Sequence, residues 1–117
     1  MQPWIMIQRG MVTGWEDKMN IREELGKRML FFDGGLGSLL QARGLKPGEL
    51  PETWNLSKPE ELLAIHKEYL EAGADIILAN TFGANRFKYD HLQEIVEAAV
   101  KNAKKAAEEC GRNAYVA

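Results

Sequence analysis

Short apolar runs alternate along the chain with longer stretches in which apolar residues recur every three or four positions. The run at residues 29–32 is wholly apolar, which is typical of a strand buried on both faces of a parallel sheet. A second buried run begins at residue 74 and ends in Asn80 and Thr81, and residues 114–117 begin a third. Because strands that alternate with helices imply right-handed crossovers, the pattern predicts an α/β fold with a parallel sheet.

Helical periodicity predicts four helices before and between these runs, at residues 21–27, 38–43, 57–71 and 90–110. Asn20 is suited to cap the first helix, and the spacing of Ser57 and Glu60 matches a capping box at the start of the third. Gly73 follows the third helix and predicts a left-handed cap. The last helix carries a narrow, alanine-rich stripe of the kind that packs closely on a sheet.

The length of the chain limits what it can build. Its 117 residues, 45% of them hydrophobic, are enough for one modest core. A parallel sheet of so few strands cannot cover its own edges or both of its faces. We therefore predict that residues 20–117 are the opening part of a larger α/β domain. Residues 1–19 are expected to be an extension that is disordered, or that reflects a start codon assigned too early, since Met19 leads directly into the first predicted element.

Charge and cysteine content narrow the function classes. The formal net charge is −2, with basic and acidic residues interleaved, which argues against a nucleic-acid partner. Cys110 is the only cysteine, so the chain has no internal disulfide and no metal site built from several cysteines, and a reducing, cytoplasmic setting fits best. The first twenty residues lack a continuous apolar core of signal length, so the sequence gives no support for export or membrane insertion.

Polar residues and glycines follow the first two predicted strands. Asp33, Gly34 and Gly35 come directly after the first strand, and Asn80 and Thr81 end the second. The carboxyl ends of parallel strands are where such folds bind ligands, so these five residues are the candidate substrate-binding site. The Asp33 carboxylate would suit an ammonium group. Asn80 and Thr81 could hydrogen-bond a substrate, hold Asp33 in place, or cap the loop that follows.

The glycine cluster has two other interpretations. Gly35 and Gly37 supply the first half of a dinucleotide-binding fingerprint, but Leu40 stands where the third glycine is needed for close helix packing. Asp33, just before the turn, would also repel a pyrophosphate. The incomplete fingerprint therefore argues against a self-contained nucleotide-binding module. The second interpretation is that the glycines only permit a tight turn.

Three further residues, His66, Cys110 and Trp54, could have a functional role, and each has a simpler structural interpretation. His66 lies on an apolar helix face, where a histidine is more often a hydrogen-bonded core residue than a catalyst, and His91 carries no signal. Cys110, in the last turn of a helix, is expected to be a small buried apolar residue rather than a nucleophile. Trp54 is expected to anchor the loop before the third helix. No residue is assigned as catalytic or as a metal ligand.

Four linked blocks of the sequence resemble a known family in both order and spacing. They are DGGLGS at residues 33–38, LPETWNL at 50–56, IHKEYLEAGAD at 65–75 and ANTFGANR at 79–86. Through these blocks, residues 20–117 are similar to the start of the homocysteine-binding methyltransferase domain. That domain is found at the N-terminus of cobalamin-dependent methionine synthase, in betaine-homocysteine methyltransferase and in stand-alone homocysteine methyltransferases.

The resemblance implies the N-terminal portion of a (β/α)₈ TIM barrel. In that family a zinc ion held by three cysteine thiolates binds homocysteine as its thiolate, because the metal lowers the pKa of the thiol. The thiolate then attacks a methyl group carried by methylcobalamin or another donor, which gives methionine. By position, Asp33 and the backbone of Gly34 and Gly35 would hold the amino acid end of homocysteine, and Asn80 and Thr81 would line the same pocket.

The chain departs from the family in one respect that bears on activity. The zinc ligands of the family lie on late barrel strands, as one cysteine followed by a Cys-Cys pair, and Cys110 matches none of them. The resemblance therefore implies a fragment of a zinc-dependent homocysteine S-methyltransferase of the methionine synthase type, inactive on its own, with any cobalamin or folate domain outside these residues. The alternative is a truncated, non-catalytic paralogue or subunit that associates with a separate chain to complete a barrel.

Overall fold

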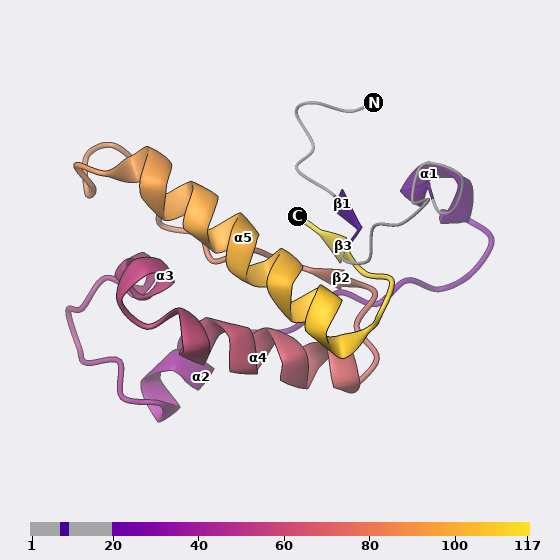
Figure 1. The fold of residues 1–117 in the computed structure, drawn as a ribbon, viewed down its shortest axis with the longest axis horizontal. Helices are drawn as coiled ribbons and strands as arrows, with labels where there is room; N and C mark the ends of the chain where they lie inside the picture. The colour runs from indigo at the N-terminus through magenta and orange to yellow at the C-terminus, as the bar shows by residue number, and fades with distance from the viewer. Residues whose placement is uncertain (1–7, 10–19) are drawn as a thin grey trace.

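The computed structural model describes residues 20–117 and the backbone of Gln8 and Arg9 (Figure 1). The described helices are α1 (Ile21–Glu24), α2 (Gly37–Ala42), α3 (Trp54–Ser57), α4 (Pro59–Glu71) and α5 (Leu92–Cys110), with a 3₁₀ helix, η2, at Pro51–Thr53. The described strands are β1 (Gln8–Arg9), β2 (Ile76–Ile77) and β3 (Tyr115–Val116). Strands β2 and β3 pair in parallel, which confirms the parallel arrangement predicted for the second and third apolar runs.

The predicted helices are present, with shifted ends. Asn20 caps α1 as expected, its Oδ1 accepting from the N–H of Arg22 at 3.0 Å, although α1 is only four residues long. The predicted capping box at Ser57 is wrong, because Lys58 is the N-cap of α4 and no side chain caps that helix. The Ser57 hydroxyl instead donates to the carbonyl oxygen of Thr53 at 3.1 Å. Ser57 is the last residue of α3, and its hydroxyl bonds the backbone carbonyl four residues earlier, a contact that serine side chains commonly make within helices.

Helices α4 and α5 lie side by side and pack on one face of the sheet (Figure 1). The core between them combines the alanine stripe of α5 with apolar residues of α4, β2 and β3: Leu70, Ile77, Ala99, Ala103, Ala106, Ala107 and Val116. The predicted role of the stripe is confirmed, since these alanines are buried. A second core cluster packs α2 and α3 against α4, through Leu40, Leu45, Trp54, Leu62 and Ile65.

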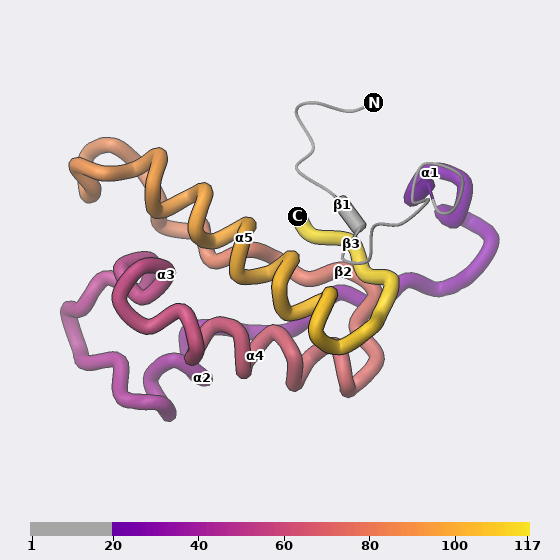
Figure 2. Tube along the Cα trace, viewed as in Figure 1, coloured from indigo at the N-terminus to yellow at the C-terminus, as the bar shows by residue number. Residues whose placement is uncertain are grey.

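The first predicted strand, at residues 29–32, departs most from expectation. Only Phe32 forms a bridge, in parallel register with Ile76, and the side chains of Met29, Phe31 and Phe32 are 72%, 55% and 60% exposed. The segment runs beside β2, as the trace in Figure 2 shows, but it is not buried on both faces. Helices α4 and α5 cover the face that carries Ile77. Phe32 lies on the same face as its partner Ile76, which is only 2% exposed, so the exposure of Phe32 reflects its place on the outermost segment of the sheet rather than an uncovered face.

Strand β1 was not predicted from the sequence. Gln8 and Arg9 pair antiparallel with Val116 and Tyr115, so the sheet order is β1-β3-β2. Strand β1 therefore covers the edge of β3 that β2 leaves free, which protects that edge from other pairing. These two residues depart from the disorder predicted for residues 1–19, and the rest of that prediction lies outside the described residues.

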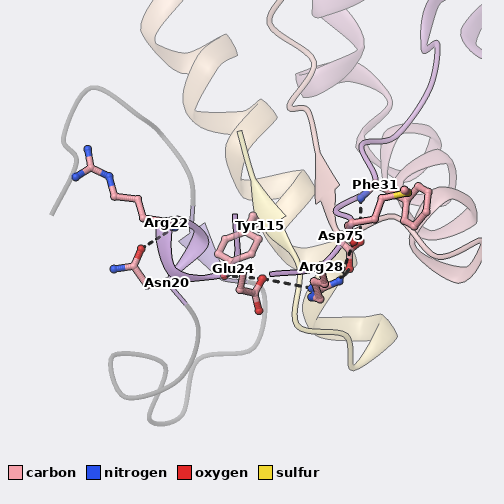
Figure 3. Close-up of polar contacts among 8 residues, drawn as sticks. Asn20, Arg22, Glu24, Arg28, Phe31, Asp75 and Tyr115 are labelled. Atoms are coloured by element: carbon pink, nitrogen blue, oxygen red, sulfur yellow. Dashed lines mark hydrogen bonds and ion pairs between the residues drawn. The ribbon is translucent and has the colours of Figure 1, made fainter. Parts of the chain in front are cut away.

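Polar contacts fix the amino ends of the sheet segments (Figure 3). The carboxylate of Asp75, just before β2, accepts from the N–H of Phe31 at 2.9 Å and pairs with the guanidinium of Arg28 at 3.2 Å. Arg28 also pairs with Glu24 of α1 at 3.3 Å, and the Tyr115 hydroxyl donates to the same Glu24 carboxylate at 3.4 Å. These contacts hold the extended segment 29–33 alongside β2, and so determine where the carboxyl end of that segment lies.

Candidate functional site

Asp33 lies at the carboxyl end of the extended segment, beside the carboxyl end of β2. Its backbone N–H donates to the carbonyl oxygen of Ile76 at 2.9 Å, and its Oδ2 accepts from the N–H of Leu78 at 3.0 Å. The other carboxylate oxygen, Oδ1, is buried without a hydrogen-bond partner among the described residues. Burial raises the pKa of the Asp33 carboxyl, and the hydrogen bond from Leu78 opposes this in part. A carboxylate in this state favours a cationic donor, such as the ammonium group suggested by the sequence.

Tyr69 of α4 borders the site. Its hydroxyl donates to the carbonyl oxygen of Gly35 at 2.6 Å. A Cβ atom at Gly34 would lie 2.9 Å from the Tyr69 hydroxyl oxygen, so the close approach of this side chain requires glycine at position 34. Asp33, Gly34 and Tyr69 line one shallow cleft together with Phe31. The sequence pattern placed Tyr69 only among the apolar positions of its helix, because nothing local indicates that its hydroxyl reaches Gly35.

We expect Gly34→Ala to displace the Tyr69 ring and to lower the free energy of unfolding by about 1–3 kcal/mol, the usual cost of inserting a methyl group into a packed contact. The matched control is Gly37→Ala, since a Cβ atom there has nothing within 4 Å. Urea denaturation followed by circular dichroism measures both variants. Equal stability of the two variants would show that the Tyr69 contact does not restrict position 34.

Asn80 and Thr81 lie at the same end of the sheet, but no hydrogen bond joins either side chain to Asp33 among the described contacts. The Asn80 side-chain amide donates to the carbonyl oxygen of Pro51 at 3.1 Å and to Oδ1 of Asn55 at 3.0 Å. Both N–H groups of this amide are therefore used within the protein, which favours the loop-anchoring alternative for Asn80. Thr81 is half-buried, and its hydroxyl has only a 3.5 Å contact with the Ala79 carbonyl oxygen. Its hydroxyl is the more available of the two groups.

His66, Trp54 and Cys110 do not line the cleft at Asp33. His66 is 1% exposed, but the hydrogen bond expected for it is wrong, since neither ring nitrogen has a partner among the described residues. Burial lowers the pKa of His66 to about 4. Trp54 is fully buried and donates from Nε1 to Glu49 at 2.8 Å, which confirms an anchoring role, although it begins α3 rather than lying in a loop. Cys110 packs against the main core, and burial raises the pKa of its thiol.

The described residues do not fit a zinc ion of the kind that the resemblance implies. Within residues 20–117, no three or more His, Cys, Asp or Glu side chains lie close enough together to hold a metal. Cys110 is the only thiolate donor available, at the end of α5. No chemical step is therefore assigned to a metal held by this chain.

Within residues 20–117, no helix is both long enough and apolar enough to cross a membrane.

Fold and site together define an α/β protein with a carboxylate-bearing cleft at the carboxyl ends of adjacent parallel segments. A family described as homocysteine S-methyltransferase matches residues 30–117 of the chain. The chain belongs to this family. The match includes every candidate site residue, from Asp33 to Thr81.

Relatives of known function agree with this family. The methionine synthase of Mycobacterium tuberculosis is 30% identical over an alignment that covers 83% of this chain and 9% of that protein. The methionine synthase of Mycobacterium leprae is 38% identical over 56% of this chain and 6% of that protein. The chain thus spans less than a tenth of the length of these relatives.

Solved structures give the same assignment at the level of the fold. The homocysteine methyltransferase MmuM from Escherichia coli, in its oxidized form, is 25% identical with a TM-score of 0.63, over 76% of this chain and 34% of that one. Its apo form is also 25% identical, with a TM-score of 0.60, over 80% of this chain and 37% of that one. The chain therefore corresponds to about a third of the length of these structures.

Proposed function

We propose that this chain is part of a homocysteine S-methyltransferase, in which it forms the opening portion of a (β/α)₈ barrel and binds the amino acid end of homocysteine. The observation that carries the proposal is the Asp33 carboxylate. Its Oδ2 is held by the N–H of Leu78, while its buried Oδ1 has no partner among the described residues. A fixed carboxylate with one free oxygen is well suited to accept a hydrogen bond from the substrate ammonium group.

The other predicted residues take supporting parts in this proposal. Gly34 and Gly35 bring backbone close to Asp33, under the Tyr69 side chain. The Thr81 hydroxyl would border the same pocket, and Asn80 would hold the loop that carries it. A zinc ion, when bound, supplies a thiolate nucleophile at neutral pH by lowering the thiol pKa, and its ligands would lie outside these residues. Methyl transfer would therefore need more of the barrel and a methyl donor such as methylcobalamin.

The association alternative is favoured by one observation. Several large apolar side chains are exposed on the sheet and its adjoining loops, among them Met29, Phe31, Phe32, Leu78, Phe82 and Phe87. Exposed apolar surface of this extent is typical of a face that another polypeptide segment covers. In the enzyme that segment would belong to the same polypeptide, whereas in the alternative it would be a separate chain.

Sequencing the source gene in frame beyond the codon for Ala117 separates the two proposals. Further strand-helix units that lead to one cysteine, and then to a Cys-Cys pair in a glycine-rich loop, would support the enzyme. A stop codon directly after Ala117 would remove the catalytic proposal for this product. The association alternative would then be tested by isolating the chain with its partner.

We expect Asp33→Asn to raise the KM for homocysteine on the order of 10- to 100-fold in the protein that carries the complete barrel, because an amide cannot replace the charge-assisted contact to ammonium. The fold should tolerate this change. Burial raises the pKa of Asp33, so its ionised form costs stability as the pH rises through that pKa, and the neutral amide avoids this cost. The control is Asp90→Asn, which changes an exposed carboxylate. An unchanged KM in Asp33→Asn would refute the substrate-binding role.

A further inference from the structure

The loop that follows β2, at residues 81–89, is tied to η2 by a single buried carboxylate. Glu52 of η2 is 4% exposed. Its Oε2 accepts from the N–H of Gly83 at 3.1 Å, and its Oε1 accepts from the hydroxyl of Tyr89 at 2.5 Å. Glutamate is rarely buried to this degree without a cationic partner, so both hydrogen bonds are needed to compensate the lost hydration.

The two residues that hydrogen-bond to Glu52, Gly83 and Tyr89, both favour this contact. A Cβ atom at Gly83 would lie 3.0 Å from Oε1 of Glu52, so a side chain at that position would push the carboxylate away. Tyr89 is buried, and burial together with the Glu52 hydrogen bond raises the pKa of its hydroxyl. Tyr89 therefore remains a hydrogen-bond donor across the physiological pH range.

Apolar packing does not explain how the rest of the loop is held. The side chains of Phe82 and Phe87 are 105% and 93% exposed, so they bury almost no surface. Within the loop, Oδ1 of Asn85 accepts from the N–H groups of Phe87 and Lys88 at 2.9 and 3.2 Å, which shapes the turn but does not attach it to the protein. The polar attachment of the loop to η2 comes from Glu52, beside the buried Tyr89 side chain.

Thr81 lies between two anchors that come from the same region of the chain. On one side, Asn80 is bonded to Pro51 and to Asn55, and the Asn55 side chain donates back to the Asn80 carbonyl oxygen at 2.9 Å. On the other side, Gly83 is bonded to Glu52. The residues of η2 and α3 therefore determine where the Thr81 hydroxyl lies relative to Asp33.

We propose that Glu52 is a positioning residue for the substrate pocket, which holds the loop at residues 81–89 through Gly83 and Tyr89 and thereby places Thr81. The proposal rests on the proposed function in so far as Thr81 borders the homocysteine site. Glu52 acts through the loop and does not itself contact the substrate.

The test compares Glu52→Ala, Glu52→Gln and Tyr89→Phe in the full chain by amide hydrogen exchange, resolved by residue with NMR. Glu52→Ala removes both acceptors, so exchange at Gly83 should accelerate about 10- to 100-fold. Glu52→Gln should restore slow exchange, because its amide oxygen accepts from Gly83 and its amide nitrogen donates to the Tyr89 oxygen. Tyr89→Phe should give an intermediate effect. The matched control is Glu60→Ala, at an exposed glutamate in the first turn of α4.

Exchange at Leu70, in the core of α4, separates positioning from general stability. Faster exchange at Gly83 with unchanged exchange at Leu70 supports the proposal. Acceleration of both amides by the same factor, no acceleration at Gly83, or a Glu52→Gln variant that behaves like Glu52→Ala would overturn it.

A titration with L-homocysteine, followed through the Asp33 and Thr81 amide resonances, gives the second measurement. Weaker binding in Glu52→Ala, restored in Glu52→Gln, supports the proposal, and equal binding in all variants overturns it. If the unmodified chain shows no response to homocysteine, substrate binding by this chain fails, while the exchange data still decide whether Glu52 positions the loop.

Discussion

Acidification from pH 6.5 to pH 4 is expected to remove about 3 kcal/mol of the free energy of unfolding through one side chain, His66. His66 lies on α4 and is 1% exposed, and neither ring nitrogen has a hydrogen-bond partner among the described residues. Burial disfavours the charged imidazolium and lowers the pKa from 6.5 to about 4. Each pH unit between the two pKa values corresponds to about 1.4 kcal/mol.

The sign of this effect follows from proton binding. Above pH 6.5 the ring is neutral in both the folded and the unfolded chain, so the stability is fully present. Between pH 6.5 and 4 the unfolded chain binds a proton that the folded chain excludes, and stability falls as the pH falls. Below pH 4 the folded chain also becomes protonated, and the loss from His66 levels off.

Substitution of each histidine tests this expectation. His66→Leu should flatten the dependence of stability on pH between 6.5 and 4, and should raise stability at pH 7, because two buried polar atoms without partners are removed. His91→Gln changes the other histidine, which is exposed, and should retain the slope of the original protein. Urea denaturation at several pH values measures all three proteins. An identical slope in His66→Leu would show that another group controls the acid transition.

The sequence predicted the parts of the fold that depend on local periodicity. It did not predict the parts that depend on packing between segments distant in the sequence. The alanine stripe and the capping residues Asn20 and Gly73 act within one element, and α4 and α5 were predicted to within a few residues. The exposure of Phe32 follows from its place on the outermost segment of the described sheet, which the apolar run cannot reveal. The capping box at Ser57 failed because a second short helix directly precedes α4, and the motif alone does not indicate this.

In the candidate site too, the sequence predicted local features and did not predict contacts between distant residues. Asp33 was identifiable because an acid directly after an apolar strand lies where such folds bind ligands. Tyr69 and Glu52 were not identifiable, since each acts through a partner more than thirty residues away in the sequence. Glu52 and Asn55 stand close to apolar residues in the block LPETWNL, but this pattern alone does not indicate that either side chain is buried. Only the structure shows that both side chains face inward and bind the loop after β2.

Trp54→Ala is expected to lower the free energy of unfolding by about 3–5 kcal/mol, a large part of the 5–15 kcal/mol typical of a natural domain. The indole is fully buried in the cluster with Leu40, Leu62 and Ile65, so its removal leaves a cavity that joins α2, α3 and α4. The change also removes the Nε1 hydrogen bond to Glu49 and the position of Lys58 over the ring, 4.3 Å from its centroid.

The comparison that interprets this loss uses two further variants. Trp54→Phe keeps most of the buried ring surface and loses the hydrogen bond to Glu49, so it should cost about 1–2 kcal/mol. Leu56→Ala, on the same helix but 49% exposed, should cost less than Trp54→Ala by several-fold. Urea denaturation followed by circular dichroism gives the three values. Similar losses for Trp54 and Leu56 would mean that α3 is not held by its tryptophan, and that Asn55 needs another support to reach Asn80.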